Sequence, residues 1–313
     1  MASCSPFEDY QVGQVLTLSV IPEHGKQSSD STVRARIRQL QNPRTLSCCM
    51  IVDLLGEGSP DNPVFLKLYD RRFSEQLRCD HGIDPWKRDA EKAYINAVRT
   101  GAARHFLHNL HTIPNFKEDT EETWDDGQNE AFLTSQVHEL FDNETTVYDT
   151  LRDIQGKLVP RLVARVHLPL SFPDAGIELL HIKGILLQYI DGFSLSEVQD
   201  HAPRSEWQAI VDKAVNIVQA VGDHGVLNRD VRPDNFIVQR DSSGCYRVFM
   251  IDFGLARLRG ANETDRDWAK AKLNKDEEGA VGLVMKKRLA RAGFEVRFEN
   301  SERYMEWAGG DDE

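Results

Sequence analysis

The chain has 313 residues, 40% of them hydrophobic and 28% charged, which excludes collagen-like, mucin-like and wholly disordered classes and leaves ample length for a buried core. Its 50 acidic and 38 basic residues give a net charge of −12, which disfavours nucleic acid and anionic membranes as partners. We see neither an apolar run near the ~20 residues of a membrane span nor a secretory signal, so we expect an intracellular protein, cytoplasmic or nuclear.

Residue patterns in the first 70 residues predict β-structure. Val15–Ile21 is a strand-like run, and Thr32–Arg38 alternates basic with apolar residues, which indicates one exposed and one buried face. A polar turn that contains Ser28 and Ser29 lies between these two runs. Two further apolar runs, Cys48–Leu55 and Val64–Tyr69, predict the third and fourth strands.

Helical periodicity follows this β-rich part. Asp84 as a cap and Pro85 at the first helical position predict a helix that runs towards His111. Lys117–Glu130 carries seven acidic residues and one base, and we expect a solvated loop there. A second helix is predicted from about Asn129 to Gln155. Its apolar stripe consists of Leu133, Val137, Leu140, Tyr148 and Leu151.

The remaining elements divide the chain in two. Strand-like runs at 162–166 and 185–190 complete the first half. A 3.6-residue apolar period over 207–221 predicts a buried helix, and a hairpin is expected from 236–238 and 247–251. We therefore predict a β-rich part over 1–190, with a helical and acidic insertion at about 73–130. A mostly helical part, with at most two helices after residue 254, is predicted over 191–313.

Two short strings carry the strongest chemical signal. The first is Asn228-Arg229-Asp230-Val231-Arg232-Pro233-Asp234-Asn235-Phe236, and the second is Met250-Ile251-Asp252-Phe253-Gly254. An Asp and an Asn five positions apart on one loop can aim a carboxylate at a substrate hydroxyl and an amide oxygen at Mg²⁺. A second carboxylate, delivered by a hairpin, can hold metal that bridges phosphates.

In this order and spacing, the two strings resemble the catalytic loop and the Asp-Phe-Gly metal site of the protein kinase-like superfamily. The resemblance runs from about Val64 to Gly254. It implies an α+β, two-lobed kinase-like fold with a β-rich N-lobe, a helical insertion, a shortened helical C-lobe and an ATP site between the lobes. Within the superfamily, the string Glu144–Leu151 is similar to uncharacterised kinase-like proteins of filamentous fungi.

The resemblance implies catalytic and metal-binding roles for residues of the two strings. Asp230 would orient the acceptor hydroxyl and accept its proton, and Arg232 would stabilise the transferring group. Asn235 and Asp252 would hold Mg²⁺.

Upstream positions would bind the nucleotide. Lys67, at the end of Val64-Phe65-Leu66-Lys67, would contact the α- and β-phosphates of ATP. Leu187 would be the gatekeeper, and Gln188 and Ile190 would offer backbone groups to adenine. The turn with Ser28 and Ser29 would cover the phosphates.

The resemblance requires a carboxylate partner for Lys67, and two candidates remain open. Glu91 shares a helix face with Tyr94 and Ile95, and Glu144 lies on the apolar stripe of the later helix. Periodicity does not choose between them. The order of elements favours Glu144, because only its helix leads directly into the next two strands.

Four departures from the kinase pattern shape the functional prediction. The first turn has no Gly-x-Gly-x-x-Gly, Asn228 replaces the usual histidine, and Arg232 replaces the usual lysine. No Ala-Pro-Glu follows Gly254, and we expect too little chain for the peptide-docking subdomain. We therefore predict an ATP- and Mg²⁺-dependent phosphotransferase that is atypical or acts on a small molecule, with a nucleotide and an unidentified acceptor as partners.

Two alternatives stay open. One is a pseudokinase or regulatory scaffold. The other is a kinase-like fold that performs another group transfer in fungal metabolism, either nucleotidyl or aminoacyl-tRNA-dependent. A tRNA partner would need concentrated basic patches such as Lys286–Arg291. Without such a partner, we expect these basic residues to form the solvent-exposed side of a helix. His105, His108 and His111 are predicted to form a solvated helix face.

Overall fold

A computed structural model describes residues 9–22, 31–56, 63–169 and 178–307. It divides the chain into a first unit of Met1–Asp142 and Leu162–Tyr189 and a second unit of Asn143–Arg161 and Ile190–Glu313. Both units contain helices and strands. The mixed composition does not test the two-lobed kinase-like architecture, which stays a prediction.

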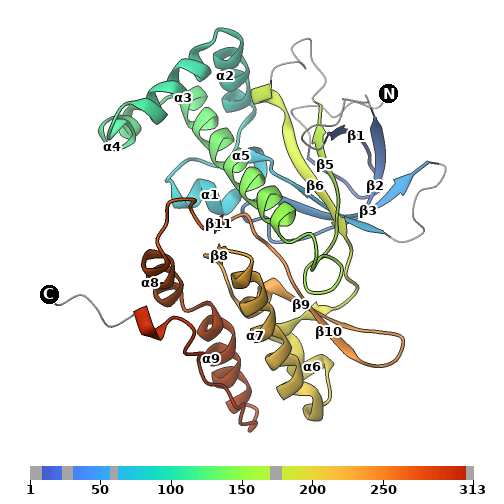
Figure 1. Cartoon of the computed structure of the whole chain (residues 1–313). Helices are drawn as coiled ribbons and strands as arrows, with labels where there is room; N and C mark the ends of the chain where they lie inside the picture. Colours follow the sequence, from blue (N-terminus) through green and yellow to red (C-terminus); the bar gives the residue numbers. More distant parts are fainter. Residues whose placement is uncertain (1–8, 23–30, 57–62, 170–177, 308–313) are drawn as a thin grey trace, which may run out of the picture. The chain divides into compact units, whose positions relative to one another are not determined.

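The first unit is built on a closed barrel of six antiparallel strands in the order β1-β2-β3-β4-β6-β5 (Figure 1). Alternate residues such as Leu16, Leu18, Leu66 and Leu68 are fully buried and fill the barrel, because successive side chains of a strand point to opposite faces. All six predicted strands are present, with ends that differ by up to three residues. They are β1 (Val15–Ile21), β2 (Thr32–Leu40), β3 (Cys48–Leu55), β4 (Val64–Leu68), β5 (Leu162–Leu168) and β6 (Ile182–Gln188).

Helices follow β4 in the first unit. They are α1 (Glu75–Asp80), α2 (Arg88–Arg99), α3 (Ala102–Thr112), α4 (Phe116–Thr120) and α5 (Asp126–Thr150), whose last turns belong to the second unit. The predicted single helix from Pro85 to His111 is wrong. The helix begins at Arg88, and Gly101 interrupts it with a φ of 81°, a left-handed conformation that cannot continue a right-handed helix.

The predicted acidic loop over Lys117–Glu130 is also wrong, because α4, a 3₁₀ turn and the start of α5 occupy most of it. Packing of Trp124 explains why this segment is helical rather than a loop. Its ring contacts Phe106 and Phe132, with ring centroids 4.9 and 5.4 Å away. The acidic residues lie largely in first helical turns, where a negative charge is favourable.

The predicted apolar stripe of the second helix is confirmed, although α5 begins at Asp126 and ends at Thr150, five residues before Gln155. Leu133, Val137, Leu140, Tyr148 and Leu151 are each at most 6% exposed. The three histidines of α3 are exposed, as predicted.

We predict that His138 on α5 makes the free energy of unfolding of the protein depend on pH. Burial and, secondarily, the charge of Lys183 lower the pKa of His138 to about 4, from 6.5. Between pH 6.5 and 4 the unfolded chain therefore binds a proton that the folded chain does not, so the free energy of unfolding falls by up to about 3 kcal/mol as pH drops through this window. Chemical denaturation at several pH values measures this slope.

A His138→Phe variant should lose this component of the slope, whereas the same substitution at the exposed His108 of α3 should keep it. An unchanged pH dependence in His138→Phe would contradict the assignment to this imidazole.

Besides the end of α5, the described part of the second unit contains four α-helices and five short strands. Helix α7 (Trp207–Asp223) lies beside α9 (Glu277–Ala290) (Figure 1), and the predicted apolar stripe of α7 is buried. The other elements are α6 (Val198–His201), α8 (Asp265–Lys275), the sheet β10 (Tyr246–Met250)–β9 (Phe236–Arg240)–β7 (Phe193–Ser194), and the pair β11 (Ala256–Leu258)–β8 (Val226–Asn228). Among the described helices, none has the length and apolar character to cross a bilayer.

Candidate functional site

The loop after β8 brings Asp230 and Asn235 together. Asn228, the last residue of β8, accepts a hydrogen bond at Oδ1 from the backbone N–H of Asp230, at 3.0 Å. A 3₁₀ turn, η6 (Pro233–Asn235), then leads into β9, with buried Pro233 at its first position, which suits the fixed φ of proline. Asn235 Nδ2 donates to the backbone oxygen of Asp230 at 2.7 Å and to its Oδ2 at 3.1 Å.

Asp252 joins the same cluster from the end of the β9–β10 hairpin. The N–H of Ile251 donates to the backbone oxygen of Asn235 at 2.9 Å, and Asn228 Nδ2 donates to the backbone oxygen of Asp252 at 3.0 Å. Asp252 has a φ of 65°. A left-handed non-glycine residue costs of order 1–3 kcal/mol and concentrates at functional sites. Asp230, Asn235 and Asp252, predicted as site residues, therefore lie together in the second unit.

Arg232 supplies a cation beside this cluster. Its Nη2 lies 3.5 Å from Asp230 Oδ2, and the side chains of Arg232 and Asp230 are 53% and 29% exposed. Both groups are thus partly open to solvent, where an incoming substrate could reach them.

The oxygen atoms of the cluster fit a magnesium ion that is shared with a phosphate. Because Asn235 Nδ2 faces Asp230, its Oδ1 points elsewhere and accepts no hydrogen bond within the described part of the chain. In that same part, no group of three His, Cys, Asp or Glu side chains could hold a metal alone. One carboxylate, one amide oxygen and phosphate oxygens are, however, the donor set that Mg²⁺ uses in phosphoryl-transfer sites.

The end of α5 supports the Asp252 segment within the second unit. Asn143 Nδ2 donates to the backbone oxygen of Gly254 at 3.3 Å, and the ring of Tyr148 meets Phe253 edge-on with centroids 5.6 Å apart. Glu144 lies between these two contacts along the helix and is fully buried.

Lys67 belongs to the first unit, on β4, and is 6% exposed. It is paired in the sheet with Cys49 on β3 and Ile185 on β6. Its Nζ lies 5.4 Å from the ring centroid of Tyr69. The predicted pairing of Lys67 with Glu144 stays a prediction.

The other nucleotide-binding predictions fall on different parts of the chain. Leu187 is 5% exposed on β6, next to Gln188, which ends that strand and pairs with Val64. Ile190 begins the last segment of the second unit. Ser28 and Ser29 lie outside the described residues.

Glu91, the rival partner for Lys67, is already occupied in the first unit. Its Oε2 accepts hydrogen bonds from Arg71 Nη1 and Nη2 at 2.9 and 2.8 Å and from Trp86 Nε1 at 3.0 Å. Arg71 thus pairs with the charge of the buried Glu91 carboxylate without Lys67, although Glu91 Oε1 is buried and has no hydrogen-bond partner in the described part of the chain.

The chain is similar to a serine/threonine-protein kinase. It is 30% identical over 109 residues to PknJ of Mycobacterium bovis and to PknJ of Mycobacterium tuberculosis. The matched region is 32% of this chain and 18% of each PknJ, so the chain spans less than a fifth of the length of the curated relatives it matches. No family model matches the chain. The narrower resemblance to fungal kinase-like proteins stays a prediction.

Sequence reasoning missed the part that Asn228 plays. The sequence indicated only that Asn228 replaces the usual histidine, yet its side chain connects the Asp230 amide to the Asp252 carbonyl. Its amide side chain, with one donor and one acceptor group, was the available signal.

Proposed function

We propose that this protein is an ATP- and Mg²⁺-dependent phosphotransferase of kinase-like, two-lobed fold. The observation that carries the proposal is the hydrogen-bonded cluster of Asp230, Asn235 and Asp252. The partial similarity to a serine/threonine-protein kinase supports the same reaction class.

Each residue of the cluster has a distinct task in the proposed reaction. Asp230, partly exposed and 3.5 Å from Arg232, orients the acceptor hydroxyl and accepts its proton. Asn235 Oδ1 and the Asp252 carboxylate hold Mg²⁺, which neutralises charge on the phosphates when it is bound. Arg232 stabilises the transferring group with its guanidinium.

Residues outside this cluster complete the proposed nucleotide site. Lys67 binds the α- and β-phosphates, and Glu144 is its proposed partner because the charge of Glu91 is already paired with Arg71. Backbone groups of Gln188 and Ile190 bind adenine beside Leu187.

The phosphotransferase is proposed to be atypical or to act on a small molecule, rather than to be an ordinary protein kinase that docks a peptide. Only residues 255–264 separate Gly254 from α8. Glu263 folds this segment back on itself by pairing with both terminal nitrogens of Arg257, at 2.7 and 2.8 Å. A segment this short, with its two ends joined by an ion pair, offers little surface for docking a peptide. Nucleic acid and membranes are not proposed as partners, given the net charge of −12.

The experiment that tests this function compares thermal unfolding with ATP, with Mg²⁺ and with both. Ligand at 100 times its Kd stabilises the folded state by about 2.7 kcal/mol, which raises Tm. We expect stabilisation by ATP and Mg²⁺ together, and its Mg²⁺-dependent part should vanish in Asp252→Asn. Asparagine tolerates the left-handed backbone of position 252, so this variant should fold.

The same substitution at the exposed Asp212 of α7 is the matched control and should leave the shift intact. No stabilisation of the wild-type chain would reject the phosphotransferase. That result would favour the second candidate function, a regulatory scaffold. The lack of a Gly-x-Gly-x-x-Gly string in the first turn supports this candidate.

A further inference from the structure

The helices that follow β4 build a small core of their own in the first unit. Helices α2 and α3 and the start of α5 contribute to it (Figure 1). Its buried members are Tyr94, Ile95, Val98, Ala103, Phe106, Ala131, Phe132 and Leu180. None of these described residues belongs to the cluster that fills the barrel. The helices therefore form a separate hydrophobic layer, and the proposed function assigns no role to α3 or α4.

A pocket of about 230 Å³ opens beside this core, between α2, α3, α4 and the start of α5. Its apolar lining comes from Ala97, Ala102, Ala103, Phe106 and Phe116. The rings of Phe106 and Phe116 meet edge-on, with centroids 6.0 Å apart. Ala102 is exposed and Phe116 is half-buried, so solvent reaches the lining. We call this surface the insertion pocket.

The wall of the insertion pocket is pre-formed. Gly127, in the first turn of α5, lies so close to α2 that a Cβ there would be 3.2 Å from Ala97 Cβ and 3.3 Å from the backbone oxygen of Ala93. Asp125 and Gln128 cap this turn reciprocally. The N–H of Gln128 donates to Asp125 Oδ1 at 2.8 Å, and the N–H of Asp125 donates to Gln128 Oε1 at 3.0 Å. A partner would meet a fixed surface, which lowers the ordering cost of binding.

The size of the insertion pocket favours part of a protein over a whole small molecule. Pockets that enclose drug-sized ligands measure about 300–1,000 Å³, whereas this one measures about 230 Å³. Interfaces with peptides and proteins commonly place a few apolar anchor side chains in such hollows. A chain segment that presents one or two apolar side chains therefore fits this size.

The surroundings of the insertion pocket are acidic. Asp125 lines the pocket and is exposed. The exposed acidic side chains of the adjoining α4–α5 segment are Glu118, Asp119, Glu121, Glu122 and Asp126. Against these six, residues 97–128 hold three bases, Arg99, Arg104 and Lys117, and Lys117 already pairs with Glu121 at 3.4 Å. An acidic surface attracts cationic partners and repels acidic ones.

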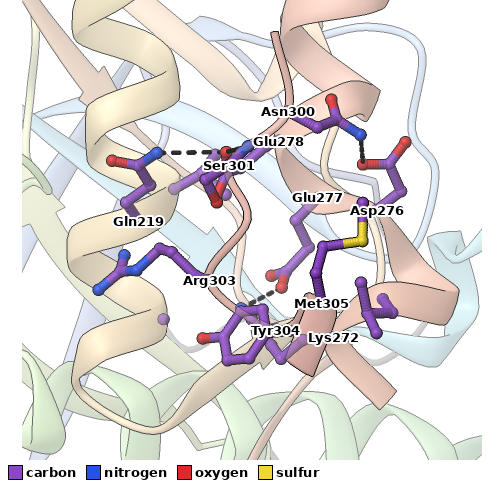
Figure 2. A pocket seen from close by; sticks show the side chains of 13 residues that line it. Gln219, Lys272, Asp276, Glu277, Glu278, Asn300, Ser301, Arg303, Tyr304 and Met305 are labelled. Atoms are coloured by element: carbon purple, nitrogen blue, oxygen red, sulfur yellow. Dashed lines mark hydrogen bonds and ion pairs between the residues drawn. The ribbon is translucent and has the colours of Figure 1, made fainter. Parts of the chain in front are cut away.

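The pocket of about 250 Å³ in the second unit has a different character (Figure 2). Its polar side chains pair with one another. Ser301 Oγ donates to Glu278 at 2.7 Å, and Asn300 Nδ2 donates to Asp276 at 3.0 Å. The buried Lys272 of the same pocket pairs with Glu277. A partner would have to break these bonds to enter, whereas the apolar lining of the insertion pocket requires no such exchange.

We propose that the insertion pocket is a docking site for a basic segment of a partner protein. An apolar side chain of that segment enters the pocket against Phe106 and Phe116, and lysines or arginines on either side of it face the exposed acidic residues of α4 and α5. This inference goes beyond the proposed phosphotransferase function and does not depend on it.

Selection of a displayed library of random peptides on the full chain tests the proposal. We expect the enriched peptides to carry an aromatic or aliphatic residue flanked by lysines and arginines. Fluorescence anisotropy of labelled enriched peptides then measures Kd for the wild type and for each variant, and circular dichroism verifies that each variant keeps its helices.

Ala102→Phe fills the mouth of the insertion pocket from an exposed position of α3. It should raise Kd at least about tenfold, because the anchor side chain loses its place. The same substitution at the exposed Ala290 of α9 is the matched control and should leave Kd unchanged.

The double variant Glu118→Gln/Glu122→Gln tests the charge. Removal of two exposed carboxylates should raise Kd about two- to tenfold. Glu295→Gln/Glu299→Gln removes two exposed carboxylates from the second unit and should have no effect. A change from 0.1 M to 1 M salt shortens the Debye length from about 10 to about 3 Å, so it should weaken binding to the wild type more than to the Glu118/Glu122 variant.

Three outcomes would overturn the proposal. One is a selection that enriches no peptide or enriches acidic ones. Another is a set of basic peptides that bind the folded Ala102→Phe variant as tightly as the wild type. The third comes from sedimentation of the chain without peptide, where a dimer that Ala102→Phe dissociates would assign the pocket to a second copy of the chain.

Discussion

Replacement of Asp230 by asparagine is expected to lower the rate of phosphoryl transfer by about 10²–10⁴-fold and to leave Mg²⁺-dependent ATP binding intact. The carboxylate is the proposed proton acceptor, and an amide cannot take that proton. Asparagine keeps the side-chain size and an oxygen that can accept the 3.1 Å bond from Asn235 Nδ2, so the loop should hold its shape. Single-turnover transfer of labelled phosphate from ATP, alone and with cell extract, measures the rate.

Asp234→Asn is the matched control for this experiment. Asp234 is exposed in the same loop, and the substitution makes the same chemical change four residues away. We expect its transfer rate to stay near that of the wild type. Equal transfer by Asp230→Asn and the wild type would remove Asp230 from the proposed chemistry.

Local sequence patterns located the strands and the candidate loop because their determinants are local. Asp230 and Asn235 are five residues apart, and a short hairpin delivers Asp252 beside them. The hydrogen bonds that join these residues lie within this one stretch of chain, so their spacing in the sequence was enough to predict that they lie close together.

Non-local contacts account for what the sequence left open. Closure of the barrel depends on pairing of β1 with β5, which lies more than 140 residues further along the chain. The bond from Asn228 to Glu277 spans 49 residues, and no local motif marks Glu277 as its acceptor. Helical periodicity likewise did not predict the ion pair of Arg71 with Glu91, because it indicates only that Glu91 lies on a helix face.

Loss of Glu130 is expected to destabilise the protein by about 3–5 kcal/mol, because it leaves the buried guanidinium of Arg78 without its charged acceptor and that of Arg71 with Glu91 alone. Glu130 on α5 is 1% exposed and accepts from Arg78 Nη2 at 2.8 Å and from Arg71 Nη1 at 3.0 Å. Arg71 and Arg78 are themselves 7% and 3% exposed. Urea denaturation of Glu130→Ala measures the change in the free energy of unfolding.

Glu121→Ala is the comparison that separates burial from charge. Glu121 also pairs with a cation, Lys117 at 3.4 Å, but its side chain is 45% exposed. Because water solvates both partners of an exposed pair, that substitution should cost no more than about 1 kcal/mol. Similar losses in the two variants would contradict the view that Glu130 stabilises the first unit through desolvated ion pairs.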